Sequence, residues 1–404
     1  MSTLRYRLNT LHLSDIRGLA DLAAHGTRDV AGVVEGVHQA IHATLGLRQR
    51  AAAGRTAGIT GLVYRSVDGI VRLTAAGLDT SLAIAEPLAR RLGHEPTSSE
   101  RRDVLIGALN GVLGDLLASK GNPLALPMTF HHASEPVDWD EPGAVPTARG
   151  KVMVMIHGLC MTEHCWTRRP GEKPVQSVGD LAVELGYTPM ALRYNSGRSI
   201  AENGQELAEQ LEMLQARWPV AIRDLTLLGH SMGGLLTRSA MAHGERLGHE
   251  WPGRLRHVAF LGTPHHGAPL ERAGAWLDTL LHRIPHTRPF AGLSRRRSQG
   301  IRDLGCGRIG PARASAWTLP EGVRSLAIAG TLSGQADPGG LSGALQHLAG
   351  DGLVPVSSAL GKPAGPDQDP DWPDHTPVVL TDTSHMDLLR SAEVLRCLRR
   401  WLRD

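Results

Sequence analysis

Three polar residues stand in an order that suits nucleophilic catalysis. Ser231 lies in Gly-His-Ser-Met-Gly, Asp351 lies between two glycines, and His385 follows a short apolar run near the end of the chain. A serine hydroxyl is a poor nucleophile, so it needs a base and a group that orients that base. The order predicts that His385 takes the Ser231 proton and that Asp351 holds the imidazole in the correct tautomer.

Other acidic residues compete with Asp351 for the orienting role. Asp278 and Asp303 fall in a stretch that has the composition of an insertion, and Asp382 stands close to the end of an apolar run. Asp351 comes at the carboxyl end of a predicted strand, where open α/β sheets place their sites. We therefore favour Asp351, with His385 as the only histidine after the last predicted strand.

The setting of Ser231 strengthens the motif. A bare G-x-S-x-G arises often by chance, but here an apolar run at 224–228 predicts a strand and 235–243 has the spacing of a helix. A serine on such a sharp turn is a nucleophile elbow. A Cβ at Gly229 or Gly233 would crowd the neighbouring strand or helix. The competing interpretation is an ordinary loop that links two elements.

An oxyanion hole requires two backbone N–H groups. The residue after the nucleophile, Met232, supplies one, and Leu159 in the loop after the apolar run 151–156 supplies the other. Gly158 would let the backbone approach the substrate. The alternative for His157 and Gly158 is a plain turn at the end of a strand.

The remaining histidines suggest substrate contacts. His265 and His266 come too early in the chain for the base and are expected to line the mouth of the site. The predicted substrate-binding set is therefore His157, Gly158, His230, His265 and His266. A zinc site of His157, Cys160, His164 and Cys165 has a spacing that fits no standard finger, so we predict neither metal nor cofactor.

Strands and helices alternate along residues 151–404, which predicts a doubly wound, mostly parallel α/β sheet. Residues 122–150 carry prolines and acidic residues around a short apolar run, as expected of a linker or edge strands. The predicted strands are 151–156, 187–194, 225–228, 257–261, 323–329 and 378–380, and the predicted helices are 178–185, 200–218, 235–243 and a C-terminal helix through Leu388 and Leu402.

Residues 1–121 have helical periodicity throughout. The clearest helix begins at the capping box Thr97–Glu100, presents an apolar face from Val104 to Leu117, and ends before Gly121. Two interpretations stay open. These helices form a cap or a dimer surface, or they bind a lipid or polymer surface.

Composition excludes several classes of protein. The chain has 404 residues, 41% hydrophobic and 21% charged, with a formal net charge of +3. No dense Lys/Arg block with interleaved aromatics is present, which argues against nucleic acid as a partner. Four cysteines make no disulfide framework. The N-terminus lacks a signal-peptide core and no run is long enough for a membrane span, so we expect a cytoplasmic protein.

Residues from about 150 to 404 resemble the lipase and serine esterase branch of the α/β-hydrolase superfamily, as in bacterial triacylglycerol lipases and PGAP1-like esterases. The matching motifs are 154–159, 229–234, 261–267, 350–355 and 384–385. The resemblance implies a carboxylic-ester hydrolase, and the pair Gly158-Leu159 implies medium or long acyl esters. It also implies that 268–315 is a lid over the acyl site. Nothing in the resemblance reaches residues 1–121.

Three functions remain open at this point. The first is an esterase or lipase acting on a small-molecule or lipid ester, with contact to a lipid surface or a homo-oligomer through the N-terminal helices as further expectations. The second is an acyltransferase that uses the same triad. The third is a binding protein of this fold without catalysis, against which the intact set of Ser231, Asp351 and His385 argues.

Overall fold

The computed structural model describes residues 14, 17–18, 100–141, 143–167, 176–267, 298–310, 319–332, 350–362, 372 and 374–404. The chain divides into two compact units, one of residues 1–99 with 119–125 and one of 100–118 with 126–404. In the first unit, the Asn122 side-chain amide donates to the Gly18 carbonyl at 3.0 Å. The predicted helices within 1–99, and most of the predicted lid, lie outside the described residues.

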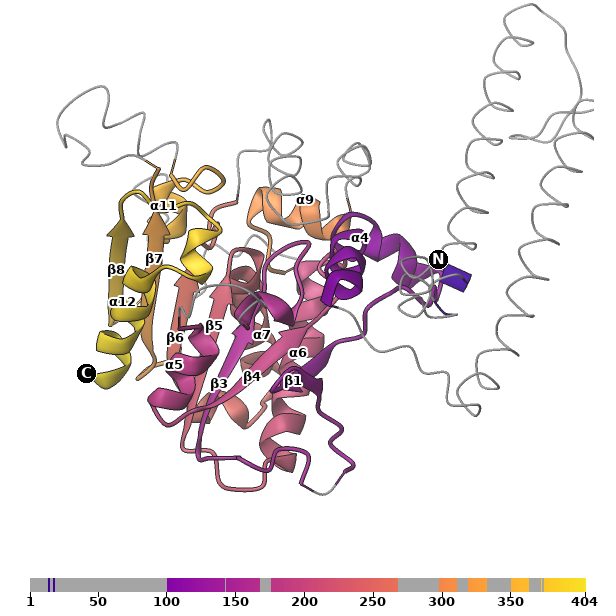
Figure 1. Ribbon diagram of the computed structural model, residues 1–404, viewed down its shortest axis with the longest axis horizontal. Coiled ribbons are helices and arrows are strands. Elements are labelled where there is room, and N and C mark those ends of the chain that lie inside the picture. Colours follow the sequence, from indigo (N-terminus) through magenta and orange to yellow (C-terminus); the bar gives the residue numbers. More distant parts are fainter. Residues whose placement is uncertain are drawn as a thin grey trace, which may run out of the picture. The chain divides into compact units, whose positions relative to one another are not determined.

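The second unit is built on an eight-stranded sheet (Figure 1). The strand order is β2-β1-β4-β3-β5-β6-β7-β8. Strand β1 pairs antiparallel with β2 and β4, whereas β4, β3, β5, β6, β7 and β8 are parallel to one another. The predicted α/β class is thereby confirmed. The strands are β1 (Thr129–His132), β2 (Glu135–Pro136), β3 (Lys151–Ile156), β4 (Thr188–Arg193), β5 (Asp224–His230), β6 (Leu255–Leu261), β7 (Arg324–Gly330) and β8 (His375–Leu380).

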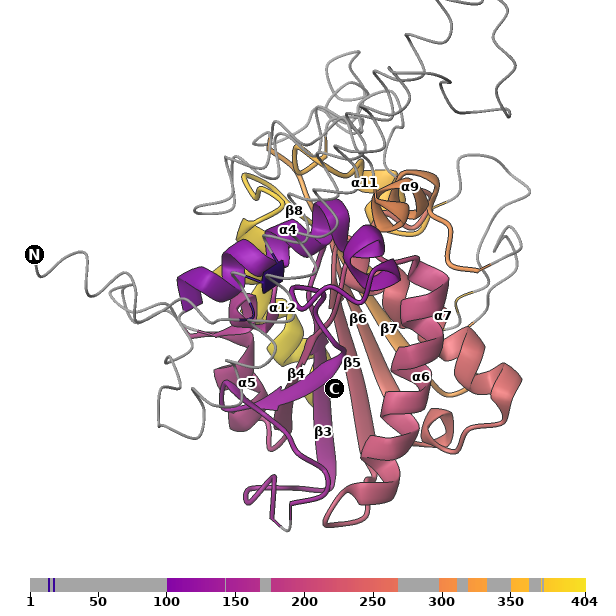
Figure 2. The ribbon, with the colours of Figure 1, turned by 90° about the vertical axis from the view of Figure 1, so that its right-hand side faces the viewer.

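Helices cover both faces of this sheet. One face carries α5 (Val178–Glu184) and α12 (Ala392–Arg403), and the other carries α6 (Ile200–Arg217) and α7 (Met232–Leu247) (Figure 2). At the carboxyl ends of the strands lie α4 (Glu100–Ser119), α9 (Gln299–Cys306) and α11 (Val356–Ala359). The short turns η1 (Glu163–Trp166) and η5 (Asp387–Leu389) belong to the loops after β3 and β8, and η2 (Trp251–Arg254) precedes β6. No described helix is long and apolar enough to cross a bilayer.

The register of the parallel strands brings several loops to one level. Ile156 pairs with Gly229, and His230 pairs with Leu261. Farther along the sheet, Gly330 pairs with Leu380. The loops that follow β3, β5, β6, β7 and β8 therefore leave the sheet together at its carboxyl edge, where the predicted site residues lie.

The burial of helix α4 differs from the amphipathic pattern that the sequence predicts. Leu105, assigned to the apolar face, is 36% exposed, while Asp103 and Asn110 are buried. From Ile106 to Gly114 the helix is buried all around. The apolar residues alone therefore misrepresent how this helix packs, because polar and glycine positions are buried as well.

Close backbone approach explains the buried glycines of α4. A Cβ on Gly111 would lie 2.9 Å from the Cα of Cys160, and one on Gly107 would lie 3.0 Å from the Met161 carbonyl oxygen. Near the end of the helix, the Asn195 side-chain amide donates to the Gly114 carbonyl at 2.9 Å. A side chain at these positions would push α4 away from the loops after β3 and β4.

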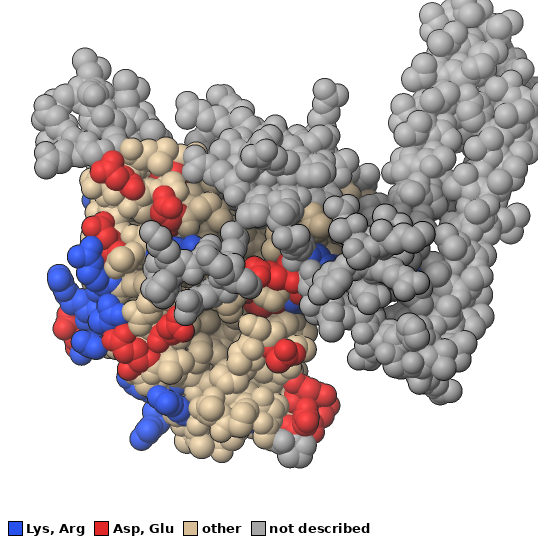
Figure 3. Space-filling view, in the orientation of Figure 1, with Lys and Arg blue, Asp and Glu red and all other residues tan. Residues whose placement is uncertain are grey.

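Charges of both signs alternate on the face drawn in Figure 3. Where α12 meets α5, Arg399 and Arg403 both pair with Glu184, at 2.9 and 3.0 Å. These pairs are exposed to solvent, so we expect them to contribute little to folding. The packing of the sheet against its helices dominates the stability of this unit.

The contact between α6 and α7 generates a prediction. A Cβ on Gly204 would lie 2.0 Å from Ser239 Oγ, so Gly204→Ala forces the two helices apart. Overpacking costs about 1–3 kcal/mol, more than the roughly 1 kcal/mol that alanine gains over glycine in a helix. We expect urea unfolding to show a lower free energy of unfolding. Gly253→Ala, with no atom within 4 Å of its added Cβ, is the control and should change it by less than about 0.5 kcal/mol. Equal stability of both variants would contradict this packing.

Candidate active site

Ser231 sits on a strained turn between β5 and α7. Its φ of 54° and ψ of −123° form a conformation that a residue with a Cβ rarely adopts. The Ser231 N–H donates to the Leu261 carbonyl on the neighbouring strand at 2.8 Å, which fixes the turn to the sheet. Ser231 is 2% exposed.

The two motif glycines allow the helix to leave the strand so sharply. A Cβ on Gly229 would lie 2.6 Å from the Cα of Gly234 in α7. A Cβ on Gly233 would lie 2.2 Å from the carbonyl oxygen of Ile156 in β3. Both positions are closed to a larger residue, as the sequence predicts, and this closeness sets the direction of the turn.

Asp351 and His385 form a buried pair. His385 Nδ1 lies 2.7 Å from Asp351 Oδ2, and the pair is inaccessible to solvent. The other carboxylate oxygen, Oδ1, accepts the N–H groups of Leu353 at 2.9 Å and Val354 at 2.8 Å. The His385 N–H also donates to the Asp351 carbonyl at 3.1 Å. Two backbone N–H groups and one imidazole thus hold this carboxylate in a single orientation.

The competing acids lie elsewhere. Asp303 is buried, but its carboxylate caps another part of the chain, accepting the N–H of Ile200 at 3.1 Å and the side-chain amide of Gln299 at 2.8 Å. Asp382 is exposed. Asp278 lies outside the described residues. Among the described acids, only Asp351 contacts His385.

His230 connects the elbow to the loop of His385. Its Nε2 hydrogen-bonds the His385 carbonyl at 3.0 Å, so Nε2 carries the proton, and the centres of the two rings are 4.7 Å apart. Burial, and then the nearby His385, hold the pKa of His230 well below its usual value, so its ring is neutral. His385 Nε2 has no hydrogen-bond partner among the described residues. Nδ1 of His385 is therefore fixed by Asp351, whereas its Nε2 is buried and bonds to none of the described residues.

The loop after β3 lies against Ser231. A Cβ on Gly158 would come 3.1 Å from the Ser231 Cβ, which shows how closely the backbone passes the nucleophile candidate. Leu159, next in the loop, is buried. Met232 is the first residue of α7, so its N–H has no acceptor within the helix. Two segments of backbone with potential donors therefore flank Ser231.

The side chains of His157 and Tyr194 hydrogen-bond to backbone carbonyls of this loop. His157 Nδ1 donates to the Gly158 carbonyl at 2.8 Å, and the Tyr194 hydroxyl donates to the His157 carbonyl at 2.8 Å. Their rings stack with centres 4.3 Å apart. Burial lowers the pKa of His157 to about 4, which keeps it neutral and able to accept at Nε2. Both residues orient backbone groups instead of facing the solvent.

His265 and His266 differ in burial. The His265 ring is buried against Phe260 and Trp372, with Arg238 Nη1 3.2 Å from its Nδ1. His266 is exposed. Of the five residues assigned to substrate binding, three histidines (His157, His230 and His265) have buried rings that make contacts inside the protein, while Gly158 adjoins Ser231.

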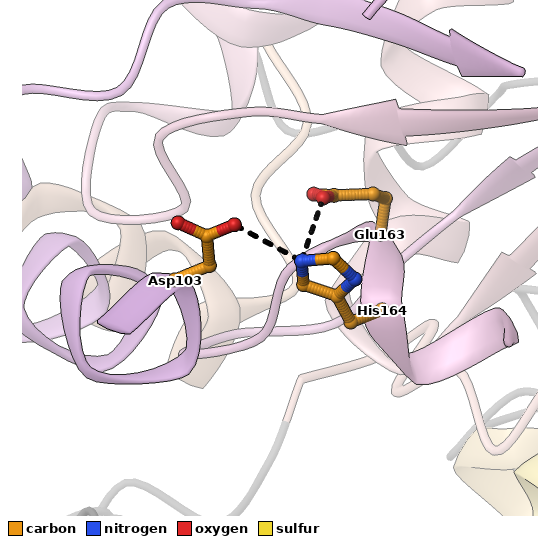
Figure 4. Close-up of side chains that lie close together, drawn as sticks. All are labelled: Asp103, Glu163 and His164. Atoms are coloured by element: carbon orange, nitrogen blue, oxygen red, sulfur yellow. Dashed lines mark hydrogen bonds and ion pairs between the residues drawn. The ribbon is translucent and has the colours of Figure 1, made fainter. Parts of the chain in front are cut away.

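A second polar cluster lies beside the same loop, and sequence reasoning missed it. Asp103, Glu163 and His164 bring their ligand-type atoms within 4.8 Å of one another (Figure 4). Arg193 binds both carboxylates, with Nη2 2.9 Å from Asp103 Oδ2 and Nε 2.6 Å from Glu163 Oε2. A guanidinium therefore fills the position between the carboxylates that a metal ion would need.

The four residues weighed as zinc ligands make other contacts in the described part of the chain. His157 bonds to Gly158, whereas His164 bonds to Asp103. Cys160 is fully buried and burial raises the pKa of its thiol. No sequence spacing could reveal the Asp103 cluster, because Asp103 is 61 residues from His164 and 90 from Arg193.

Several known proteins are similar to this chain in sequence or in structure. Residues 148–286, about a third of the chain, match the family described as PGAP1-like alpha/beta domain. A comparison with curated proteins found no match. The mature form of a Bacillus licheniformis lipase is 19% identical with a TM-score of 0.43, covering 68% of this chain and 98% of its own.

Two further solved structures are similar. An esterase from Pyrococcus furiosus is 14% identical with a TM-score of 0.41, covering 64% of this chain and 83% of its own. A thioesterase of the prodiginine biosynthetic pathway in Streptomyces coelicolor is 17% identical with a TM-score of 0.39, covering 67% and 97%. Residues 148–286 are therefore similar to the PGAP1-like alpha/beta domain, and they contain the parallel strands β3 to β6 and the turn of Ser231.

Proposed function

We propose that this protein is a serine hydrolase that cleaves carboxylic esters. Ser231 is the nucleophile, His385 the general base and Asp351 the orienting acid. The observation that carries the proposal is the buried 2.7 Å pair of Asp351 and His385 at the same edge of the sheet as the strained Ser231. A carboxylate, a histidine and a serine on an elbow are the parts that acyl transfer needs.

The chemistry follows from these positions. Ser231 Oγ attacks the ester carbonyl carbon while His385 Nε2 takes its proton. The N–H groups of Leu159 and Met232 stabilise the negative oxygen of the tetrahedral intermediate. His385 returns the proton to the departing alcohol, and Ser231 keeps the acyl group. Water, activated by the same histidine, then releases the acid.

The substrate class rests on the loop after β3. A single glycine before the bulky Leu159, as in the lipases that this chain resembles, favours medium or long acyl esters of a small molecule or a lipid. Residues 268–315 would cover the acyl chain as a lid. We further propose that residues 1–121 act as a cap, a dimer surface or a lipid-binding surface of the same enzyme.

The experiment is hydrolysis of p-nitrophenyl esters from acetate to palmitate, with Ser231→Ala as the control. We expect activity that depends on Ser231 and peaks at medium or long chains. Activity that survives in Ser231→Ala would contradict the assigned nucleophile. Absence of turnover with every ester would contradict hydrolysis of simple esters; an added alcohol or amine acceptor then tests for acyl transfer.

A prediction concerns the orienting acid. Asp351→Asn removes the negative charge that selects the tautomer of His385, so kcat should fall roughly 10⁴-fold. Asp382→Asn is the matched control, because Asp382 is exposed and its φ of 50° also suits asparagine. Steady-state kinetics should leave the control within about twofold of wild type. A kcat of Asp351→Asn close to that of the control would contradict the role of Asp351.

A second prediction concerns the support of the oxyanion loop. Tyr194→Phe leaves the buried His157 carbonyl without its hydroxyl donor, which should lower the free energy of unfolding by about 1–3 kcal/mol. Because the loop then loses its anchor, kcat should fall roughly tenfold, less than the loss of a whole oxyanion donor. Tyr187→Phe is the matched control. Tyr187 donates to Asp224 at 2.8 Å, at the far end of the strands, so it should lose stability but keep kcat. An equal effect of both variants on kcat would contradict this account.

A further inference from the structure

The cluster of Asp103, Glu163, His164 and Arg193, here called the clasp, joins three elements. Asp103 comes from α4, Glu163 and His164 from η1, and Arg193 from the end of β4. His164 Nε2 lies 3.0 Å from Asp103 Oδ2 and 3.3 Å from Glu163 Oε1. Asp103 and Glu163 are almost wholly buried. The clasp thus fixes α4 to the sheet and to η1 through charged hydrogen bonds to two buried carboxylates.

The elements held by the clasp enclose the proposed oxyanion loop. Glu163 and His164 follow Leu159 by four and five residues, so the clasp ends the loop. Helix α4 packs against the outer side of this loop. There it contacts Cys160, whose φ is 61°, and Thr162, whose Cγ2 would lie 2.6 Å from a Cβ added to Gly107. The loop therefore lies between Ser231 on one side and α4 on the other.

The two buried carboxylates of the clasp favour a protonated His164. The nearest neighbours of His164 Nε2 are oxygens of Asp103 and Glu163, at 3.0 and 3.3 Å, so this nitrogen donates, and the two negative charges favour the cationic ring. Two other groups adjoin the clasp. Arg102 pairs with Asp103 Oδ1 at 3.2 Å, and His131 on β1 lies 3.8 Å from Glu163. Burial lowers the pKa of His131, so its ring adds no positive charge near neutral pH.

The pKa of His164 agrees with a protonated ring. Burial alone would lower that pKa, but the hydrogen bond that His164 donates to Asp103 and the charges of Glu163 and Asp103 outweigh burial and the repulsion of Arg193. The pKa of His164 is therefore raised above 6.5. A raised folded-state pKa means that the stabilisation is complete below pH 6.5 and is lost as pH rises through the raised value.

We propose that the clasp positions the oxyanion loop, and that the proton on His164 keeps it closed. His164, Asp103, Glu163 and Arg193 are positioning residues that act through α4 and η1 on the backbone of Leu159. This inference rests on the proposed function, because it assigns the loop to the oxyanion. Loss of the positive charge on His164 removes its attraction for the two buried carboxylates, loosens α4 and slows acyl transfer.

The test is the pH profile of kcat and KM with a short p-nitrophenyl ester, using Ser231→Ala as the blank. In wild type, kcat should fall roughly threefold to tenfold on the alkaline side, with KM unchanged, because the oxyanion contacts strengthen in the transition state. His164→Gln should have the low kcat at every pH and no alkaline decline. Asp103→Asn should move the decline to lower pH, because it removes the charge that favours the proton. His132→Gln, a half-exposed neighbour outside the clasp, should match wild type.

A measurement that does not depend on turnover separates the clasp proposal from the proposed function. NMR titration of the His164 ring should give a pKa above 6.5 in wild type and a lower one in Asp103→Asn, and this measurement also serves if His164→Gln fails to fold. If wild type hydrolyses esters through Ser231 but His164→Gln keeps the same kcat and the same alkaline decline, the clasp proposal is wrong. If no ester is hydrolysed, the proposed function fails, and an unraised His164 pKa would by itself overturn the protonated clasp.

Discussion

The strained backbone of Ser231 is the constraint on which the rest of this unit depends. A non-glycine residue in such a conformation costs about 1–3 kcal/mol, and it persists only where the surroundings leave no alternative. Here α7 passes so close to β5 and β3 that a Cβ on Gly229 would collide with the backbone of α7 and one on Gly233 with the backbone of β3. The hydrogen bond from Ser231 to Leu261 ties the turn to the next strand. The core of the sheet therefore stabilises the arrangement that presents the serine.

The unit contains two carboxylate–histidine pairs with opposite designs. Asp351 is satisfied by backbone N–H groups and by one nitrogen of His385, which leaves the other nitrogen without a partner among the described residues. In the clasp, His164 Nε2 lies between two carboxylates, and Arg193 binds both of them. The first arrangement keeps a base available for chemistry. The second uses its proton for attachment, so it serves position instead of reaction.

The sequence predicts the sheet and its motifs because each depends on local pattern. The apolar run of β3 and the strand, serine turn and helix around Ser231 are contiguous, so periodicity and glycine spacing suffice to find them. Chain order and the ends of strands also single out Asp351 and His385, whose side chains lie 2.7 Å apart in the structure. The pattern gives no signal for ring orientation, and His265 is accordingly turned inward against Trp372.

Helix α4 shows where such prediction ends. Its apolar residues suggest one buried face, but Asp103 and Asn110 are buried too, and its glycines contact loops that lie far along the chain. Asp103 gains its partners His164 and Arg193 only when η1 and β4 are in place, 61 and 90 residues later. A buried charge is tolerable only with such partners, and their identity depends on the tertiary fold.

The most direct test of the central claim is to expose the protein to a fluorophosphonate ester and map the modified peptide by mass spectrometry. This reagent captures a serine only where a base activates its hydroxyl. The account predicts one adduct per chain, on Ser231, and none in Ser231→Ala. An unmodified Ser231 in folded protein, or an adduct on another serine alone, would contradict it.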